Sequence, residues 1–219
     1  MITRYGYDNF FALLAGSMML VVFGIQADMS ITRHVLIVLG IGVAAFAFWF
    51  FRNPRRRIPA EALSDDSIVL APADGTIVRI VTTDEPRLIQ GIAIQISIFL
   101  SPLDVHVNRI PANGEIVFSD YKPGKFLIAT NHRASEENEQ TIIGLVNSKG
   151  AIVFKQLTGV LARRIVNEAH VGQRYSAGEE FGMMKFGSRM DILVPETADV
   201  RVSVGQRVVG GETILCQLR

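Results

Sequence analysis

Residues 92–99 read Ile-Ala-Ile-Gln-Ile-Ser-Ile-Phe, a run in which isoleucine alternates with alanine, glutamine and serine. A period of two is typical of a strand with one face in the core and the other facing water. Residues 75–81, 151–156 and 200–204 form similar β-branched runs, and Gly, Pro, Asn and Asp separate them. We therefore expect a mainly β (α+β) fold, a β-rich sandwich or flattened barrel with antiparallel strands.

A short motif occurs twice in this part of the chain. Residues 72–78 read Pro-Ala-Asp-Gly-Thr-Ile-Val, and residues 111–117 read Pro-Ala-Asn-Gly-Glu-Ile-Val. In each copy the Asx-Gly pair favours a tight turn that leads into a strand. The repeat fits two similar turns in an all-β fold and equally fits a duplicated half-barrel. Residues 134–140 are short and polar, which predicts a surface loop or a single helical turn.

Two uncharged apolar runs, residues 10–25 and 35–51, precede the β-rich part. Each is slightly short for a transmembrane helix, which needs roughly 20 apolar residues. The pair is expected to cross the membrane as a hydrophobic helical hairpin or to lie in its interface. A cleaved signal peptide is disfavoured because the first run lacks a basic leader beyond Arg4. A helical hairpin buried in a soluble domain is the remaining alternative.

Basic residues follow the second apolar run directly, because four arginines lie within residues 52–57, after the aromatic stretch 48–51. Such clusters stay on the cytoplasmic side and are attracted to anionic lipid. The sequence thus predicts a membrane-associating helical hairpin with a basic flank over residues 1–57. A β-rich domain over residues 58–219 is expected on the cytoplasmic face of the cell (inner) membrane.

Composition limits the function classes. The chain has 219 residues, of which 49% are hydrophobic, and a net charge of +1. These values exclude intrinsic disorder and give no general electrostatic reason to bind nucleic acid. The single cysteine, Cys216, cannot form an intramolecular disulfide and is expected to be a small buried apolar residue. No metal site is expected, because no HxH, HExxH or CxxC spacing occurs among Cys216 and the four histidines, His34, His106, His132 and His170.

A Gly-Ser pair lies near the C-terminus in residues 180–195, which read Glu-Phe-Gly-Met-Met-Lys-Phe-Gly-Ser-Arg-Met-Asp-Ile-Leu-Val-Pro. Alone it is a weak signal. In its context, residues 52–219 resemble the phosphatidylserine decarboxylase proenzymes, specifically the short bacterial and archaeal form. Six motifs in series carry the resemblance: Phe51-Arg-Asn-Pro54, Ala71-Pro-Ala-Asp-Gly75, Phe99-Leu-Ser-Pro-Leu-Asp-Val-His106, Gly124-Lys-Phe126, Ala134-Ser-Glu-Glu-Asn-Glu139 and Phe186-Gly-Ser188.

The resemblance implies a protein that makes its own cofactor. The β-rich catalytic domain would cut itself between Gly187 and Ser188, leaving a β chain of residues 1–187 and an α chain of residues 188–219. Ser188 would become a covalent pyruvoyl group at the start of the α chain. Glycine suits this position, because without a Cβ its carbonyl is accessible to the serine hydroxyl.

The same resemblance implies catalytic roles for Ser188, His106 and Asp74. Serine needs a base to become a nucleophile, and His106, oriented by Asp74, would remove its proton. The pyruvoyl group would then form a Schiff base with the amine of phosphatidylserine and accept the electrons released as CO2 leaves. Reprotonation, also assigned to His106, would give phosphatidylethanolamine. The expected partners are phosphatidylserine, membrane lipids and the two fragments as a heterodimer, with higher oligomers left open.

This chain departs from the better-known long form of the family at two places. Arg109 stands where a second histidine is expected, which leaves His106 as the only local proton carrier. Residues 131–135 read Asn-His-Arg-Ala-Ser in place of a commoner Asp-Lys, so His132 is a candidate neighbour of the site. Four cations are candidates for binding the lipid phosphate, although solvated surface charge is the favoured interpretation of each: Lys122, Lys125, Arg163 and Arg164.

Two other functions fit parts of the sequence. Residues 202–212 read Val-Ser-Val-Gly-Gln-Arg-Val-Val-Gly-Gly-Glu, which is similar to biotinyl or lipoyl carrier domains and to membrane adaptors. A carrier needs a modifiable lysine in a hairpin turn, and the nearest match, Met184-Lys-Phe186, directly precedes the Gly-Ser pair. The alternative function is therefore a non-enzymatic, membrane-anchored adaptor that stays uncut. A pyruvoyl decarboxylase for a soluble amino acid shares the chemistry, but the apolar N-terminus argues against it.

Overall fold

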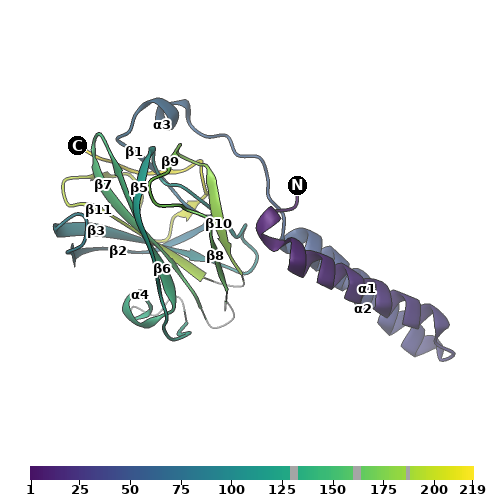
Figure 1. Ribbon diagram of the computed structural model, residues 1–219. Helices are drawn as coiled ribbons and strands as arrows, with labels where there is room; N and C mark the ends of the chain where they lie inside the picture. The colour runs from purple at the N-terminus through teal and green to yellow at the C-terminus, as the bar shows by residue number, and fades with distance from the viewer. Residues whose placement is uncertain (129–132, 160–163, 186–187) are drawn as a thin grey trace. The chain divides into compact units, whose positions relative to one another are not determined.

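The computed structural model describes residues 1–128, 133–159, 164–185 and 188–219 (Figure 1). The chain divides into two compact units, Met1–Arg55 and Arg56–Arg219. The first unit is helical and the second, called the body below, is built mainly from strands. The expected fold class, mainly β with an N-terminal apolar helical pair, is confirmed.

The first unit consists of a short 3-10 helix, Arg4–Gly6 (η1), and two long helices, Tyr7–Gln26 (α1) and Ser30–Phe50 (α2). Both long helices are long and apolar enough to cross a membrane, and only 17% and 11% of their most apolar windows are buried. The expectation that each run is short for a span was wrong, because polar residues at the start of each helix continue it by about one turn. The low burial argues against a hairpin buried in a soluble domain.

Small residues let α1 and α2 pack closely. The Ser17 hydroxyl donates to the Gly40 carbonyl at 2.7 Å, and a Cβ on Gly40 would lie 2.9 Å from the Ser17 carbonyl oxygen. Close packing through glycine and serine is typical of paired membrane helices. The Asn53 amide donates to the Met1 carbonyl at 2.7 Å, so the chain enters and leaves the pair at the same end.

One antiparallel sheet of eight strands forms most of the body (Figure 1). Its strands, in spatial order, are Arg207–Val208 (β13), Gly75–Glu85 (β2), Gly91–Leu100 (β3), Ser188–Pro195 (β11), Gly150–Leu157 (β7), Gln140–Asn147 (β6), Gly114–Lys122 (β5) and Arg174–Tyr175 (β9). The strand that begins with Ser188, β11, therefore lies in the middle of the sheet, between β3 and β7.

Two smaller sheets and two short helices complete the body. One sheet contains Ile68–Leu70 (β1), Ile214–Gln217 (β14) and Asp199–Val200 (β12), and the other contains Val107–Arg109 (β4), Glu180–Met184 (β10) and Ile165–Asn167 (β8). The helices are Ala60–Ser64 (α3) and Ala134–Glu137 (α4), and α4 is the single turn expected within residues 134–140. The strand expected over residues 200–204 was wrong beyond Val200, because a turn from Ser203 to Gln206 redirects the chain into β13.

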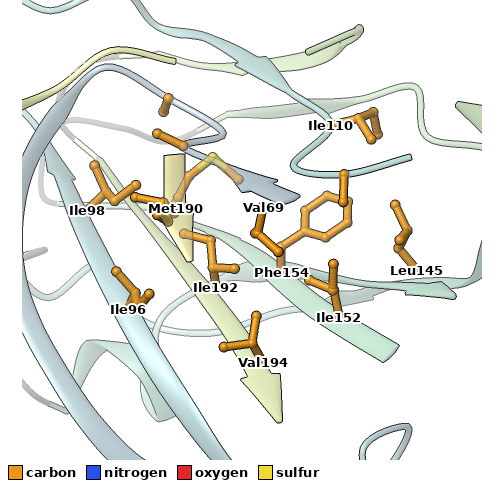
Figure 2. Close-up of a cluster of buried hydrophobic side chains, with 14 of the residues drawn as sticks. Val69, Ile96, Ile98, Ile110, Leu145, Ile152, Phe154, Met190, Ile192 and Val194 are labelled. Atoms are coloured by element: carbon orange, nitrogen blue, oxygen red, sulfur yellow. The ribbon is translucent and has the colours of Figure 1, made fainter. Parts of the chain in front are cut away.

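Alternation along the central strands separates two faces of the main sheet. Ile96 and Ile98 of β3 and Met190 and Ile192 of β11 point into one apolar cluster with Phe154 of β7 (Figure 2). All five side chains are fully buried, so this inner face is the core of the body. Residues of opposite parity lie on the outer face of the same strands. Cys216 is buried in the core, and burial raises the pKa of its thiol to about 12.

The two Pro-Ala-Asx-Gly motifs occupy equivalent places in the body. The side-chain oxygen of Asp74 accepts a hydrogen bond from the Gly210 amide at 2.8 Å, and that of Asn113 accepts one from the Ala177 amide at 2.9 Å. The strands that follow, β2 and β5, pair through their first residues with β13 and β9. Residues 204–207 and 171–174, which enter β13 and β9, both read Val-Gly-Gln-Arg. These matched contacts favour a duplicated half-barrel over two unrelated turns.

Candidate active site

Ser188 begins β11 at one end of the main sheet. It pairs with Leu100, the last residue of β3, and the next residue, Arg189, pairs with Leu157, the last residue of β7. The ends of three central strands therefore lie side by side at Ser188. The predicted cleavage partner, Gly187, lies outside the described residues.

The Ser188 side chain is on the inner face, since it has the same parity as Met190. It is fully buried, and among the described residues its Oγ has no hydrogen-bond partner. A buried hydroxyl without a partner costs free energy and calls for an explanation, and such groups concentrate where chemistry takes place. Within the described part of the chain, the Ser188 hydroxyl is therefore not used by a structural hydrogen bond.

His106 lies directly before β4 and is fully buried. Its Nδ1 is 2.9 Å from the Asp104 carbonyl oxygen, which can only accept, so Nδ1 carries the proton and Nε2 carries the lone pair of the neutral ring. The Met184 amide, at the end of β10, donates to the His106 carbonyl at 3.3 Å. His106 follows Leu100, the strand partner of Ser188, by six residues, so both residues belong to segments at this end of the body.

A turn between β3 and β4 holds His106 in this orientation. The Asp104 carboxylate accepts a hydrogen bond from the Ser101 amide at 2.8 Å, which closes the turn. The same carboxylate forms an ion pair with Arg207 at 2.5 Å, and this interaction raises the pKa of the Arg207 guanidinium. A residue of β13 thus helps to fix the carbonyl that orients His106.

Asp74 lies next to this segment through backbone pairing. The Arg109 amide donates to the Pro72 carbonyl at 2.8 Å, so the turn that carries Asp74 begins next to the end of β4. The Asp74 carboxylate itself is 2.9 Å from the Arg56 guanidinium. The orienting bond on His106 comes from the Asp104 carbonyl, so a role for Asp74 in orienting the ring stays a prediction.

Three of the cations considered from the sequence, Arg109, Lys122 and Lys125, interact with other groups of the protein. The buried Arg109 guanidinium donates to the Gly178 carbonyl at 2.9 Å and to Glu180 at 3.0 Å, and burial lowers its pKa. Lys122 donates to a main-chain carbonyl, and Lys125 forms an ion pair with Glu137 at 2.8 Å. Arg164 is exposed, whereas His132 and Arg163 lie outside the described residues. A role for Lys122, Lys125, Arg163 or Arg164 in phosphate binding stays untested.

Sequence reasoning missed two amides on the inner face. Asn108 of β4 and Gln156 of β7 are fully buried, and Gln156 Nε2 donates to Asn108 Oδ1 at 2.8 Å. The signal for Gln156 was available, since it continues the inward parity of Ile152 and Phe154 with a polar side chain. Asn108 belongs to a strand too short for a parity argument.

A charged cluster lies on the outer face of β11. Arg189 and Asp191 are almost completely buried; Arg189 donates from Nη2 to Asp191 at 2.9 Å, and its Nε makes an ion-pair contact with the same carboxylate at 2.8 Å. The Ser135 hydroxyl of α4 donates to Asp191 at 2.8 Å. This pair anchors the strand directly after Ser188. Among the described residues, no group of three or more His, Cys, Asp and Glu could hold a metal ion.

A buried serine hydroxyl and a buried histidine, in segments at one end of the β-rich body, are a pair of side chains typical of enzyme active sites. Comparison with known proteins then defines the class: residues 43–216 match the family model described as phosphatidylserine decarboxylase. The chain belongs to this family, as the resemblance predicted, and is therefore an enzyme of the decarboxylase class rather than a carrier-like adaptor.

Curated relatives agree with this assignment over most of the chain. A protein of Chlorobium phaeobacteroides (strain BS1) named phosphatidylserine decarboxylase proenzyme is 42% identical over 215 residues, which cover 98% of each chain. Proteins with the same name are 45% identical in Salinibacter ruber, over 86% of this chain and 82% of the relative, and 43% identical in Symbiobacterium thermophilum, over 81% of each.

Proposed function

We propose that this protein decarboxylates phosphatidylserine to phosphatidylethanolamine and CO2, after it has cut itself between Gly187 and Ser188. The observation that carries the proposal is the buried Ser188 hydroxyl, which has no hydrogen-bond partner among the described residues and lies at the first position of a central strand. Family membership supplies the reaction class, and the names of the relatives include the word proenzyme.

In the cleavage step, Ser188 Oγ attacks the carbonyl carbon of Gly187 and the peptide nitrogen leaves, which turns the amide into an ester. His106 Nε2 takes up the hydroxyl proton, because Nδ1 already carries a proton, which it donates to the Asp104 carbonyl. Loss of the Ser188 Cα proton then breaks the ester by elimination and leaves residue 187 with a free carboxylate. Water converts the dehydroalanine at position 188 to a pyruvoyl group and releases ammonia, so the atoms balance.

The residues around position 188 fit this group. Its chemistry is that of an electron sink: the α-keto group of a bound pyruvoyl accepts the electron pair of the bond to CO2. The chain would position it through β11, whose pairs with β3 from Arg189 to Pro195 contain no atom of the 187–188 bond. The two fragments would thus remain one folded heterodimer. The buried Arg189–Asp191 pair fixes the strand end that carries the group.

His106 also suits the proton transfer that follows loss of CO2. It is fully buried, so it delivers a proton in a site from which bulk water is excluded. The Asp104 carbonyl accepts a hydrogen bond from Nδ1 and so fixes both the orientation and the tautomer of the ring, with Nε2 as the nitrogen that exchanges the proton. Asp74, with its carboxylate bound to Arg56 and to the Gly210 amide, supplies negative charge beside this segment.

The helical pair suits a diacyl lipid substrate. Both helices are long enough to span the bilayer, and the first unit begins and ends at the same end of the pair. With the arginines of residues 52–57 on the cytoplasmic side, the body would face the cytoplasm. Attachment to the membrane raises the local concentration of a substrate that leaves the bilayer slowly.

The test is decarboxylation of phosphatidylserine by full-length protein in detergent micelles, together with the intact mass. We expect Ser188→Ala to stay uncut and to release no CO2, whereas Ser97→Ala, a fully buried serine on the outer face of β3, is cut and active. His106→Ala should slow cleavage and turnover by about 10²–10⁴-fold. A Ser188→Ala protein that still decarboxylates would refute the proposal.

A further inference from the structure

The Asn108–Gln156 pair lies beside both proposed reacting residues. Asn108 follows His106 by two positions, and Gln156 pairs with Met190, which follows Ser188 by two positions on the inner face. Diagonal neighbours of this kind lie about 7–8 Å apart, so the long Gln156 side chain is within reach of position 188. The amide pair therefore forms a polar floor on the core side of the Ser188 site.

The orientation of both amides follows from one carbonyl. Gln156 Nε2 donates to the Val166 carbonyl at 3.2 Å, and a carbonyl can only accept, so the Gln156 nitrogen must face β8. The Asn108 atom 2.8 Å from that nitrogen must then be oxygen. Gly182 permits this arrangement, since a Cβ there would lie 2.1 Å from the Val166 oxygen.

This orientation leaves one donor and one acceptor without partners. Asn108 Nδ2 and Gln156 Oε1 are buried, and neither has a hydrogen bond among the described residues. Burial of unmatched polar atoms is costly, so a protein that retains two of them side by side has a use for them. The pair offers an N–H to an anion or carbonyl and a carbonyl oxygen to an amine.

An α-amino acid headgroup presents the complementary pair of groups, an amine and a carboxylate on one carbon. Two neighbouring cations are engaged elsewhere: Arg109 binds Gly178 and Glu180, and Arg189 binds Asp191 on the outer face. A neutral donor suits a carboxylate that must leave as CO2, because a buried cation would stabilise the charged ground state and raise the barrier.

We propose, building on the proposed function, that Asn108 Nδ2 binds the substrate carboxylate and Gln156 Oε1 binds the substrate amine. The floor thereby selects the serine headgroup, which has both groups, over ethanolamine, which has only the amine. Loss of the carboxylate contact as CO2 departs weakens the hold on the product and favours its release. Because the carboxylate is still in place as its bond to the α-carbon begins to break, this contact is shared by the ground and transition states, and its loss should raise KM more than it changes kcat.

The experiment uses full-length protein in mixed micelles and three near-isosteric variants. They are Asn108→Leu, Gln156→Leu and, as a matched control, Gln95→Leu. The control removes a buried amide from the outer face of β3. Three readouts are taken: the extent of self-cleavage by intact mass, kcat and KM for phosphatidylserine, and reductive trapping of phosphatidylethanolamine on the 188–219 fragment. Trapping measures amine binding without turnover.

We expect Asn108→Leu to be cut, to raise KM for phosphatidylserine by about 10–100-fold and to leave kcat and phosphatidylethanolamine trapping nearly unchanged. Gln156→Leu should raise KM and reduce trapping, whereas Gln95→Leu should change neither. Asn108→Ala removes the same donor with less bulk and should repeat the Asn108→Leu result if the larger side chain prevents folding.

The inference would be overturned if trapping by the Asn108 variants falls by the same factor as KM rises, or if KM is unchanged in cut protein. The pair would then be a structural element. These outcomes differ from failure of the proposed function, in which the wild-type chain itself stays uncut.

Discussion

Two turns of almost identical sequence, at Asp74 and at Asn113, support different halves of the body. Each side-chain oxygen accepts a hydrogen bond from the main chain of a matching loop, at 2.8 and 2.9 Å. The Asp74 carboxylate also binds the Arg56 guanidinium, whereas the Asn113 amide donates to the Ala62 carbonyl at 3.0 Å. The backbone scaffold is therefore the same, and the charge differs.

The strands that pair with these turns differ in the same way. Arg207 of β13 binds Asp104, whose carbonyl orients His106. Its counterpart in β9, Arg174, is exposed and has no ion pair within the described part of the chain. The comparison teaches that one half directs charged groups toward the turn that carries His106. The other half, called the neutral half below, relies mainly on amide contacts with the main chain, together with a hydrogen bond from Asn113 to Asp66 at 3.3 Å.

The largest effect is expected from making the first turn like the second. Asp74→Asn keeps an oxygen for the Gly210 amide and removes the charge beside His106. We expect self-cleavage, followed by intact mass over time, to slow by about 10²–10⁴-fold. The reverse change, Asn113→Asp, should leave the cleavage rate within about threefold of wild type. If Asp74→Asn matures at the normal rate, the two turns have the same structural role.

A smaller effect is expected from the two equivalent arginines. Arg207→Gln removes the ion pair that holds the Asp104 turn, so the His106 ring is less well oriented. We expect kcat to fall about 10-fold and the pH–rate profile to shift, because the ring nitrogen loses its fixed donor role. Arg174→Gln is the matched control and should retain wild-type kinetics. Similar kinetics in both variants would show that Arg207 does not act through His106.

Stability should change most in the neutral half. Asn113→Ala removes bonds to the Ala177 amide and the Ala62 carbonyl, which the buried main chain does not replace. The expected loss is about 1–3 kcal/mol in the free energy of unfolding, measured by urea denaturation of the full chain in detergent and followed by circular dichroism. Decarboxylation by the folded fraction should be unchanged. A loss of kcat at full folding would give Asn113 a role in the site.

A pH-dependent change in stability is expected from Lys155, which lies on the outer face of β7. Burial lowers the pKa of Lys155 on β7, so the folded protein binds fewer protons than the unfolded chain between the two pKa values. Stability from this group therefore rises with pH up to the unfolded pKa of about 10.4. Lys155→Met should stabilise the protein by about 1 kcal/mol at pH 7. The gain should shrink toward pH 10, and a constant gain would contradict it.

Strand alternation was enough to predict β2, β3 and β7, because each buries one parity of its side chains in the core. The same rule failed after Val200, since no local pattern distinguishes a short strand from the turn that carries the chain to β13. Helix length was underestimated because apolarity, rather than hydrogen bonding through the flanking polar residues, was used to set the ends.

The candidate site shows the same limit. The motifs pointed to Ser188, His106 and Asp74, and the topology brings all three segments to one end of the body. The Asp104 carbonyl, the Arg207 ion pair and the Asn108–Gln156 amides depend on which strands become neighbours. That information lies in the register between segments distant in sequence, so residue patterns within one segment could not supply it.

The central claim is that Ser188 becomes the catalytic group, and intact mass of the protein purified from membranes in detergent tests it most directly. The account predicts two fragments, residues 1–187 and 188–219, with the second lighter than its encoded sequence by one ammonia. A single chain of encoded mass from a folded preparation would contradict the account, and the buried Ser188 hydroxyl would then need another explanation.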